Sequence, residues 1–193
     1  MKNIEVKMAF DDPESIISVL RKIGAKHKGR LHQIDTYYRC RQGRLKLRTI
    51  NDRKHVLIFY TRPDTLSGKV SEYQVFPIGA KRIKNAESLL TRTFGKLIKV
   101  EKTRDLWVYK NTRVHLDRVS GLGRFLELET VVKKDVSKAR KEYDDVTKRL
   151  ALSRYKKERG SYSDLLMKKQ NVCLRTQKPN QPEDVPNFLK DKL

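Results

Sequence analysis

The chain has 193 residues, of which 37% are hydrophobic and 35% are charged, and 45 Lys and Arg against 23 Asp and Glu give it a formal net charge of +22. This length fits one domain with a sizeable core, and so large a positive charge attracts anions such as phosphates or nucleic acid. Because no long apolar run occurs, we expect neither a transmembrane helix nor a signal peptide. Cys40 and Cys173 form no metal-ligand spacing and no disulfide framework, so a cytoplasmic location is the default expectation, with a nuclear one as the alternative.

The first part of the chain predicts a strand, a helix and a pair of strands. Polar and apolar residues alternate in "NIEVKM", which indicates a strand with two unlike faces. In "DDPESIISVLRKIG", Asp12 can cap a helix, Pro13 suits its first turn and Gly24 can end it, so a helix is expected over residues 12–24. The segments "LHQIDTYYRC" and "RLKLRTI" then predict two strands that turn at Gly43.

The rest of the chain predicts further strands and two more helices. "HVLIFYTR" and "KVSEYQVFPI" are typical of strands, and "KNAESLLTRTFG" predicts a helix that turns Leu89, Leu90 and Phe94 inward. "KLIKVEKT", "LWVYKNTRVHLDRV" and "RFLELETVV" predict more strands, and a long helix is expected over residues 135–157. About eight strands, mostly joined by short turns, favour a closed or strongly curved antiparallel sheet in an α+β fold.

We divide the chain at its C-terminal end. The segment from about Asn171 is rich in Gln, Asn, Pro and Lys, a composition that favours mobility. Residues 1–170 are therefore assigned to one domain, and residues 171–193 to a mobile basic and polar tail.

Charges are sorted by sign on several of the predicted strands. Residues at alternate positions share a face: Glu5 and Lys7; Arg44, Lys46 and Arg48; Lys102 and Arg104; Arg113, His115 and Asp117; Glu127 and Glu129. One such strand alone is most simply a solvated surface. Five of them favour a barrel whose charged faces turn toward the lumen, while helices cover the aliphatic faces.

A lumen of this kind needs a ligand that neutralises both signs of charge. Two like charges about 4 Å apart repel by roughly 4 kcal/mol at an effective dielectric near 20. A polyanion bound to the cations, together with a divalent cation bound to the carboxylates, would remove this repulsion. The pattern therefore predicts phosphoryl or nucleotidyl transfer.

A set of motifs resembles one known family over about residues 1–170. The segments "NIEVK", "QIDTYYRCRQGRLKLR", "YTRPD", "VEKTRDLW", "HLDRVSGLGRFLELE" and "SYSDLL" resemble the CYTH superfamily, or triphosphate tunnel metalloenzymes. Within it they are most similar to the class IV adenylyl cyclase-like and thiamine triphosphatase-like branch. The resemblance implies an α+β fold with an eight-stranded antiparallel closed β-barrel, or tunnel, and flanking helices.

The resemblance also implies roles for individual residues. Glu5, Glu127 and Glu129 would bind Mg²⁺ or Mn²⁺, and Asp117 would lie near the metal or its water; the implied catalytic residues are Glu5, Lys7 and Asp117. The residues implied to clasp the triphosphate are Lys7, Lys46, Arg48, Arg62, Lys102, Arg104 and Arg113. The family's first-strand motif, Glu-x-Glu-x-Lys, has Asn3 in place of its first Glu, which weakens the case for a second metal ion. His115 is interpreted as a structural or hydrogen-bonding neighbour rather than a base.

These inferences leave more than one function open. The leading hypothesis is a metal-dependent hydrolase of inorganic tripolyphosphate, thiamine triphosphate or a nucleoside triphosphate. The runner-up is an adenylyl cyclase that converts ATP to cyclic AMP and pyrophosphate, although no segment indicates a base-recognising pocket. A third hypothesis is an RNA 5′-triphosphatase, or a non-catalytic binder of RNA or another polyanion through the basic surface. Asn3 also leaves an inactive scaffold open. No membrane partner is expected.

Overall fold

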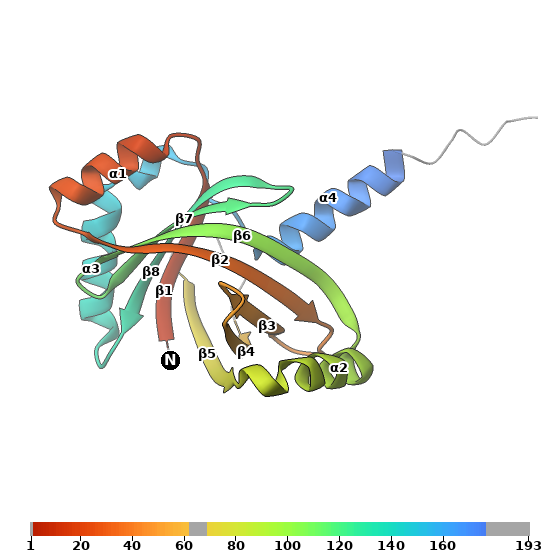
Figure 1. Cartoon of the computed structure of the whole chain (residues 1–193). Coiled ribbons are helices and arrows are strands. Elements are labelled where there is room, and N and C mark those ends of the chain that lie inside the picture. Colours follow the sequence, from red (N-terminus) through yellow and green to blue (C-terminus); the bar gives the residue numbers. More distant parts are fainter. Residues whose placement is uncertain (1, 62–68, 177–193) are drawn as a thin grey trace, which may run out of the picture.

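Eight strands form one closed antiparallel barrel in the computed structural model, which describes residues 2–61 and 69–176 (Figure 1). Around the barrel the strands are hydrogen-bonded in the order β1-β5-β4-β3-β2-β6-β7-β8. Their bounds are β1 (Lys2–Ala9), β2 (Lys26–Tyr38), β3 (Arg44–Ile50), β4 (Lys54–Thr61), β5 (Lys69–Ile78), β6 (Lys96–Tyr109), β7 (Thr112–Val119) and β8 (Gly123–Val132). The expected α+β barrel is confirmed.

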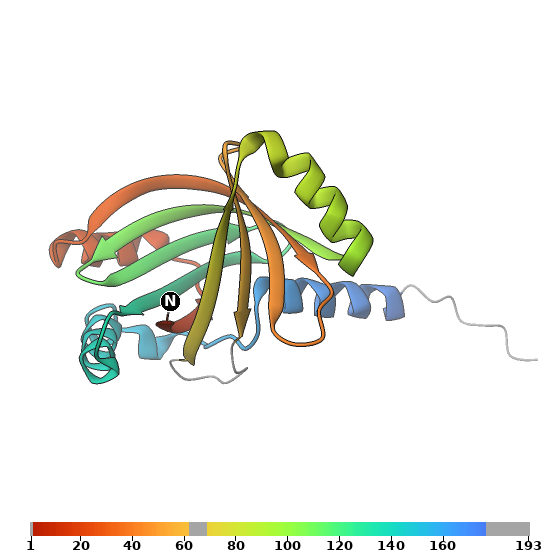
Figure 2. The ribbon, with the colours of Figure 1, turned by 90° about the horizontal axis from the view of Figure 1, so that it is seen from below.

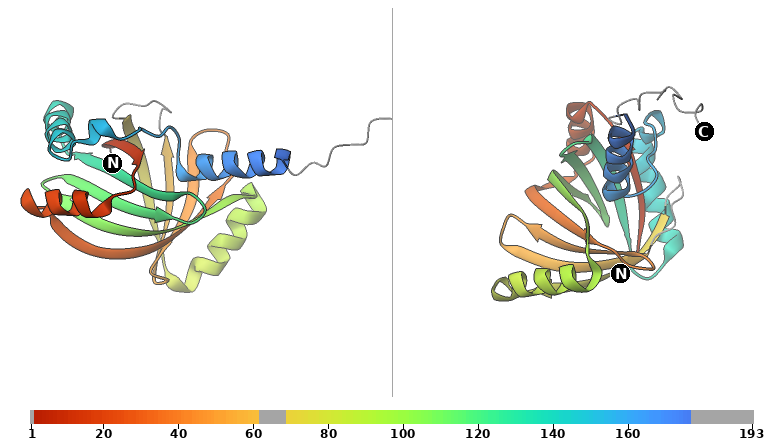
Figure 3. Two further views of the ribbon diagram at one scale, coloured as in Figure 1. Left: turned by 90° about the horizontal axis from the view of Figure 1, so that it is seen from above. Right: turned by 90° about the vertical axis from the view of Figure 1, so that its right-hand side faces the viewer.

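Four helices and two short 3₁₀ turns accompany the barrel within residues 2–61 and 69–176. The helices are α1 (Pro13–Lys22), α2 (Ile83–Phe94), α3 (Val136–Arg149) and α4 (Tyr162–Thr176), and the turns are η1 (Ala80–Arg82) and η2 (Leu152–Arg154). Helices α1 and α3 lie on one side of the barrel and α2 lies on another, whereas α4 starts at the barrel and points away from it (Figures 2 and 3). Within the described residues, no helix is both long and apolar enough to cross a membrane.

The main apolar core lies outside the barrel, between its wall and two helices. On β1, the side chains of Ile4, Val6 and Met8 are buried in one cluster with Leu20 of α1 and Val146 of α3. Successive side chains of a strand point to opposite faces, so Glu5 and Lys7 face the lumen. The helices cover the aliphatic face, as the sequence predicted, and the charged face is enclosed.

Closure of the barrel depends on a short strand pairing. β1 pairs with β8 along its whole length but with β5 only from Lys2 to Glu5. A shift of one residue in either register would turn the charged set outward and the aliphatic set inward. The length of the β1–β8 ladder and the helices packed on Ile4 and Met8 both act against such a shift.

Helix α2 differs from the prediction for its inward residues. Only Leu90 is buried, in a cluster with Tyr38 and Leu47, whereas Leu89 is 66% exposed and Phe94 is 41% exposed. The inward placement of Leu89 and Phe94 was therefore wrong. The helix contacts the barrel through a narrow stripe, and consecutive positions such as 89 and 90 are about 100° apart around a helix.

Two predicted boundaries also differ from the structure. The helix expected over residues 135–157 ends at Arg149, because Ala151 adopts a left-handed conformation (φ 49°) that a continuing helix does not allow. The segments predicted as separate strands within residues 96–109 form the single strand β6. Helix α4 spans Tyr162–Thr176, and the division of the chain into residues 1–170 and 171–193 stays a prediction. The predicted mobility of the tail stays a prediction, because residues 177–193 lie outside the described residues.

The start of α4 packs against the barrel. The segment before it runs beside β1, where the Glu158 N–H donates to the Lys7 carbonyl at 2.9 Å. Tyr162, the first residue of α4, is then buried in a cluster that includes Tyr37 and Phe125. Two aromatic side chains of this cluster, Tyr37 and Tyr162, also line the lumen.

Candidate active site in the barrel lumen

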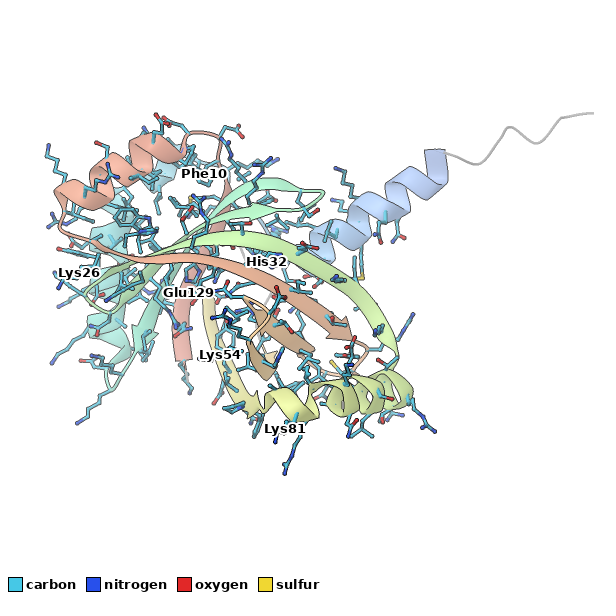
Figure 4. All side chains as sticks on the ribbon, in the orientation of Figure 1. Phe10, Lys26, His32, Lys54, Lys81 and Glu129 are labelled. Carbon is cyan, nitrogen blue, oxygen red and sulfur yellow. The ribbon has the colours of Figure 1, made fainter. Side chains whose placement is uncertain are left out.

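One cavity of about 260 Å³ lies in the lumen, and all eight strands contribute to its lining. Most of the predicted site residues line it: Glu5, Lys7, Lys46, Arg48, Lys102, Arg104, Arg113, Glu127 and Glu129. Figure 4 shows Glu129 within the ring of strands, whereas Lys26 and Lys81 lie at the periphery. Arg62 lies outside the described residues. The volume is close to the lower end of the range of about 300–1,000 Å³ for small-molecule sites, which favours a compact ligand.

A buried carboxylate that the sequence analysis did not single out holds the basic side of the cavity together. Asp35, on β2, is 1% exposed and accepts two hydrogen bonds from Arg48, at 2.6 and 2.7 Å. The Lys46 ammonium donates to the same carboxylate at 3.1 Å, and that of Lys102 lies 3.5 Å away. One carboxylate thus serves three cations from β3 and β6, and this group retains an excess of positive charge.

The protonation states of Asp35, Lys46 and Lys102 follow from their burial and from their charged neighbours. Burial alone would raise the pKa of Asp35, but Arg48, Lys46 and Lys102 hold that pKa well below its usual value. Burial and Arg48 lower the pKa of the Lys46 ammonium to about 7, against a smaller upward effect of Asp35. Burial also lowers the pKa of Lys102 to about 8, again with Asp35 acting in the opposite direction. Both lysines therefore change charge close to neutral pH.

Arg104 connects the basic side to the acidic side. Its guanidinium donates to both oxygens of Asp117, at 2.7 and 2.6 Å, and to Glu127 Oε2 at 2.9 Å. The hydroxyl of Tyr162 donates to Asp117 at 2.8 Å. The carboxylate of Asp117 is fully buried behind Arg104 and is not part of the cavity lining. Its visible role is to orient the guanidinium.

Glu127, Glu129 and His115 form the acidic side. Burial would raise the pKa of Glu127, but Lys7, His115 and Arg104 hold it well below its usual value. Burial acts in the same direction on Glu129, and His115 and Arg113 outweigh it. Both side chains are thus carboxylates at neutral pH. Their like charges lie on adjacent inward positions of β8, where cations on β1, β6 and β7 compensate them.

The donor set of this acidic side fits a divalent cation. One ligand atom each from His115, Glu127 and Glu129 lies within 4.8 Å of the others. Carboxylate oxygens bind Mg²⁺ and Mn²⁺, and an imidazole nitrogen binds transition metals. Glu5 pairs with Glu129 in the β1–β8 register but is not in this group, and its Oε2 accepts a hydrogen bond from Tyr73.

Tyr162 also contacts two cations that line the cavity. The Lys7 ammonium lies 3.9 Å from the centre of the Tyr162 ring, and that of Lys102 lies 5.0 Å from it. An ammonium over an aromatic face is attracted by the ring quadrupole. The motif "SYSDLL" therefore contributes an aromatic wall that faces two cations of the site.

Sequence reasoning missed Asp35 and the position of Tyr162. A signal for Asp35 existed, since in "QIDTYY" it alternates with Gln33 and Tyr37, and all three turn inward. No local signal places Tyr162 in the lumen, because the contact joins the start of α4 to β7, 45 residues earlier in the chain.

The chain is similar to known proteins along most of its length. The CYTH domain family matches residues 1–162. A protein of Methanocaldococcus jannaschii named "Putative adenylate cyclase MJ0240" is 25% identical over 174 residues, which are 86% of this chain and 98% of that protein.

Solved structures share the fold. The PH1012 protein of Pyrococcus horikoshii has a TM-score of 0.73 at 26% identity, over 84% of this chain and 98% of that one. HpAC1 of Hippeastrum, described as a putative adenylyl cyclase with a dominant triphosphatase activity, has a TM-score of 0.65 at 13% identity, over 88% of this chain and 96% of that one. At that identity the likeness to HpAC1 shows the fold alone. With its eight-stranded barrel and a family match over residues 1–162, the chain belongs to the CYTH domain family.

Proposed function

We propose that this protein hydrolyses a triphosphate held in the barrel lumen, with a divalent cation bound on the acidic side. One observation carries the proposal: cations from β1, β3, β6 and β7 and carboxylates from β8 surround a single cavity of about 260 Å³. A phosphate chain and a metal ion are together the ligand that compensates both signs of charge.

The cations would bind the phosphate oxygens. Arg48, Lys46 and Lys102 already converge on Asp35, so their positions do not depend on the ligand. Hydrogen bonds between such charged donors and phosphate oxygens are about twice as strong as those between neutral groups. A triphosphate would supply the negative charge that this group lacks. Arg104, oriented by Asp117, would contact the phosphate closest to Glu127.

The carboxylates would hold the metal. Glu127 and Glu129 fit Mg²⁺ or Mn²⁺ by their donor atoms, and Glu5 faces them from β1. When bound, such an ion neutralises charge on the transferring phosphoryl group and orients water. The protein's own part is to hold the three phosphates in line and to keep the carboxylates ionised.

An adenylyl cyclase remains the second candidate, because the cavity is not charged throughout. Leu31, Ile58 and Leu106 also line it, so an organic group attached to the triphosphate would find apolar contacts. The relative named "Putative adenylate cyclase MJ0240" is similar in sequence, and HpAC1, with its described triphosphatase activity, shares this fold. The same cavity would also receive the 5′-triphosphate end of an RNA.

One assay separates these functions. The purified chain is incubated with tripolyphosphate, thiamine triphosphate, ATP or a 5′-triphosphate RNA, with Mg²⁺ or Mn²⁺, and released phosphate and cyclic AMP are measured separately. We expect phosphate release, and we expect Glu127→Gln to lower turnover by about 10²- to 10³-fold.

The matched control is Glu101→Gln, because Glu101 is an exposed carboxylate on the outer face of β6 that contacts His32. If cyclic AMP and pyrophosphate are released instead, the protein is an adenylyl cyclase and the hydrolase proposal is wrong. Turnover that Glu127→Gln leaves unchanged would rule out this site.

A further inference from the structure

We propose that His115 is a nitrogen ligand of the divalent cation, so that the site favours first-row transition ions over Mg²⁺ more strongly than carboxylates alone would. The inference rests on the proposed function only in requiring that the lumen binds a divalent cation. It extends the expected all-oxygen ligand set with a residue that the sequence analysis interpreted as structural.

The first step is the position of the imidazole. His115 lies on β7, directly opposite Glu127 in the β7–β8 register, and is 3% exposed. Its Nδ1 lies 3.5 Å from Glu127 Oε2 and 3.8 Å from Glu129 Oε1. Within the described part of the chain this buried nitrogen has no hydrogen-bond partner. A buried polar atom without a partner is uncommon, and a water molecule, a ligand or an ion can satisfy it.

The second step compares these distances with metal coordination. Ligand atoms about 2.0–2.2 Å from one metal ion stand about 3–4.4 Å apart, depending on the angle between them. The two nitrogen–oxygen distances fall inside that range, and the three ligand atoms lie within 4.8 Å of one another. Small side-chain movements would therefore complete the site.

The third step distinguishes metal coordination from the simplest alternative, a hydrogen bond from the imidazole to one of the two carboxylates. A charged N–H donor approaches a carboxylate oxygen to about 2.7–2.9 Å. The arginines of the lumen do so, with Arg104 at 2.9 Å from Glu127 and Arg113 at 3.0 Å from Glu129. His115 stays more than half an ångström farther away, so the carboxylates already have their cationic donors and the imidazole nitrogen points into the space between them.

The fourth step concerns the first strand. Asn3 contributes no charge at the position of the family's first Glu, and Glu5 accepts a hydrogen bond from Tyr73. All four histidines lie in the part of the chain that the structure describes, and of these His115 alone lines the cavity. It therefore offers the site a third ligand on the β7–β8 side, next to Glu127 and Glu129.

The direct test is pulsed electron paramagnetic resonance of Mn²⁺ bound to the full chain. We expect modulation from a coordinated ¹⁴N nucleus, and its replacement by the ¹⁵N pattern when the protein is labelled with ¹⁵N-histidine. This comparison uses the unaltered protein and so does not depend on a variant that folds. Bound Mn²⁺ without nitrogen coupling would overturn the role of His115 and leave the proposed hydrolase untouched.

Metal selectivity gives a second readout, by calorimetric titration with Co²⁺ and with Mg²⁺. Since imidazole suits the later transition metals, His115→Gln should weaken Co²⁺ binding by at least about tenfold and Mg²⁺ binding by much less. The matched control is His55→Gln, because His55 is a partly buried histidine that contacts Thr49 away from the carboxylates. Equal losses for both ions would overturn the inference. A wild-type chain that binds neither ion would overturn the metal site and with it the proposed function.

Discussion

The outer and inner faces of the same strands differ in what surrounds their buried side chains. On the outer face of β1 and β8, the side chains of Ile4, Leu126 and Leu128 are completely buried beneath α1 and α3. On the inner face, Glu5 and Glu127 are almost as buried, yet Glu5 accepts a hydrogen bond from Tyr73 and Glu127 pairs with Lys7 and Arg104. The contacts outside the barrel are apolar, while those inside it are ion pairs between buried cations and buried carboxylates.

This difference teaches that burial and stabilisation are separate properties. Burying apolar surface is favourable by about 25 cal/mol per Å². A buried ion pair contributes little net stability, since desolvation offsets most of the attraction, but removing one partner is strongly destabilising. Substitutions on the two faces should therefore have different signatures, which the following predictions test.

The largest effect is expected at the centre of the inner face. Asp35→Asn leaves Arg48, Lys46 and Lys102 without their shared carboxylate and should lower the free energy of unfolding by about 3–5 kcal/mol. Tripolyphosphate should restore part of this stability, by about 2.7 kcal/mol at a concentration 100 times its dissociation constant. Urea unfolding without tripolyphosphate measures the loss of stability, and unfolding with tripolyphosphate measures the part that is restored. The control is Asp105→Asn, because Asp105 pairs with the exposed Arg30 on the outer face and should matter by less than about 1 kcal/mol.

A somewhat smaller effect is expected at the centre of the outer face. Leu128→Ala removes a completely buried side chain and should lower the free energy of unfolding by about 2–5 kcal/mol. Tripolyphosphate affinity of the folded protein should stay within about twofold of the wild type, because Leu128 points away from the lumen. Chemical denaturation measures the free energy of unfolding, and calorimetry measures the affinity for tripolyphosphate. A large loss of affinity would mean that the two faces are not independent.

A moderate effect is expected from pH on the inner face. Lys46 and Lys102, with pKa values of about 7 and 8, are charged below these values and become neutral above them. Metal-free binding of tripolyphosphate should therefore weaken as the pH rises from 6.5 to 8.5, by up to about tenfold per pH unit for each lysine above its pKa.

The same pH series with Lys46→Arg separates the effect of the protein on the pH dependence of binding from that of the ligand. An arginine stays charged across this range, so the variant should show a shallower pH dependence, and the difference between the two proteins removes the titration of the ligand itself. Parallel curves for the two proteins would contradict the assignment of the pH dependence to Lys46.

The smallest effect on stability is expected at an exposed apolar residue that lies on neither face of the barrel. Leu89→Ala, on α2, should change the free energy of unfolding by less than about 0.5 kcal/mol, because Leu89 is 66% exposed. Urea unfolding alongside Leu128→Ala gives the comparison. A destabilisation similar to that of Leu128→Ala would indicate that α2 buries this residue in solution.

Individual residues show how far prediction from the sequence reached. The shared inward face of Lys46 and Arg48, and that of Glu127 and Glu129, followed from alternation along a strand and are present in the structure. The helix of Leu89 and Phe94 was predicted, but its buried stripe was not, because the width of that stripe depends on which strands lie beneath it. The partners of Asp35 and Tyr162 could not be predicted, since each contact joins strands or helices that are distant in the sequence.

The sequence by itself determined which side chains share a face, because the two-residue period of a strand is a local property of the backbone. It also determined the imbalance of charge on those faces. Only the tertiary structure decided that the charged faces are the enclosed ones, because enclosure requires β1 to pair with both β5 and β8 and the helices to cover the aliphatic side. Burial is a property of the assembled barrel and not of any one strand.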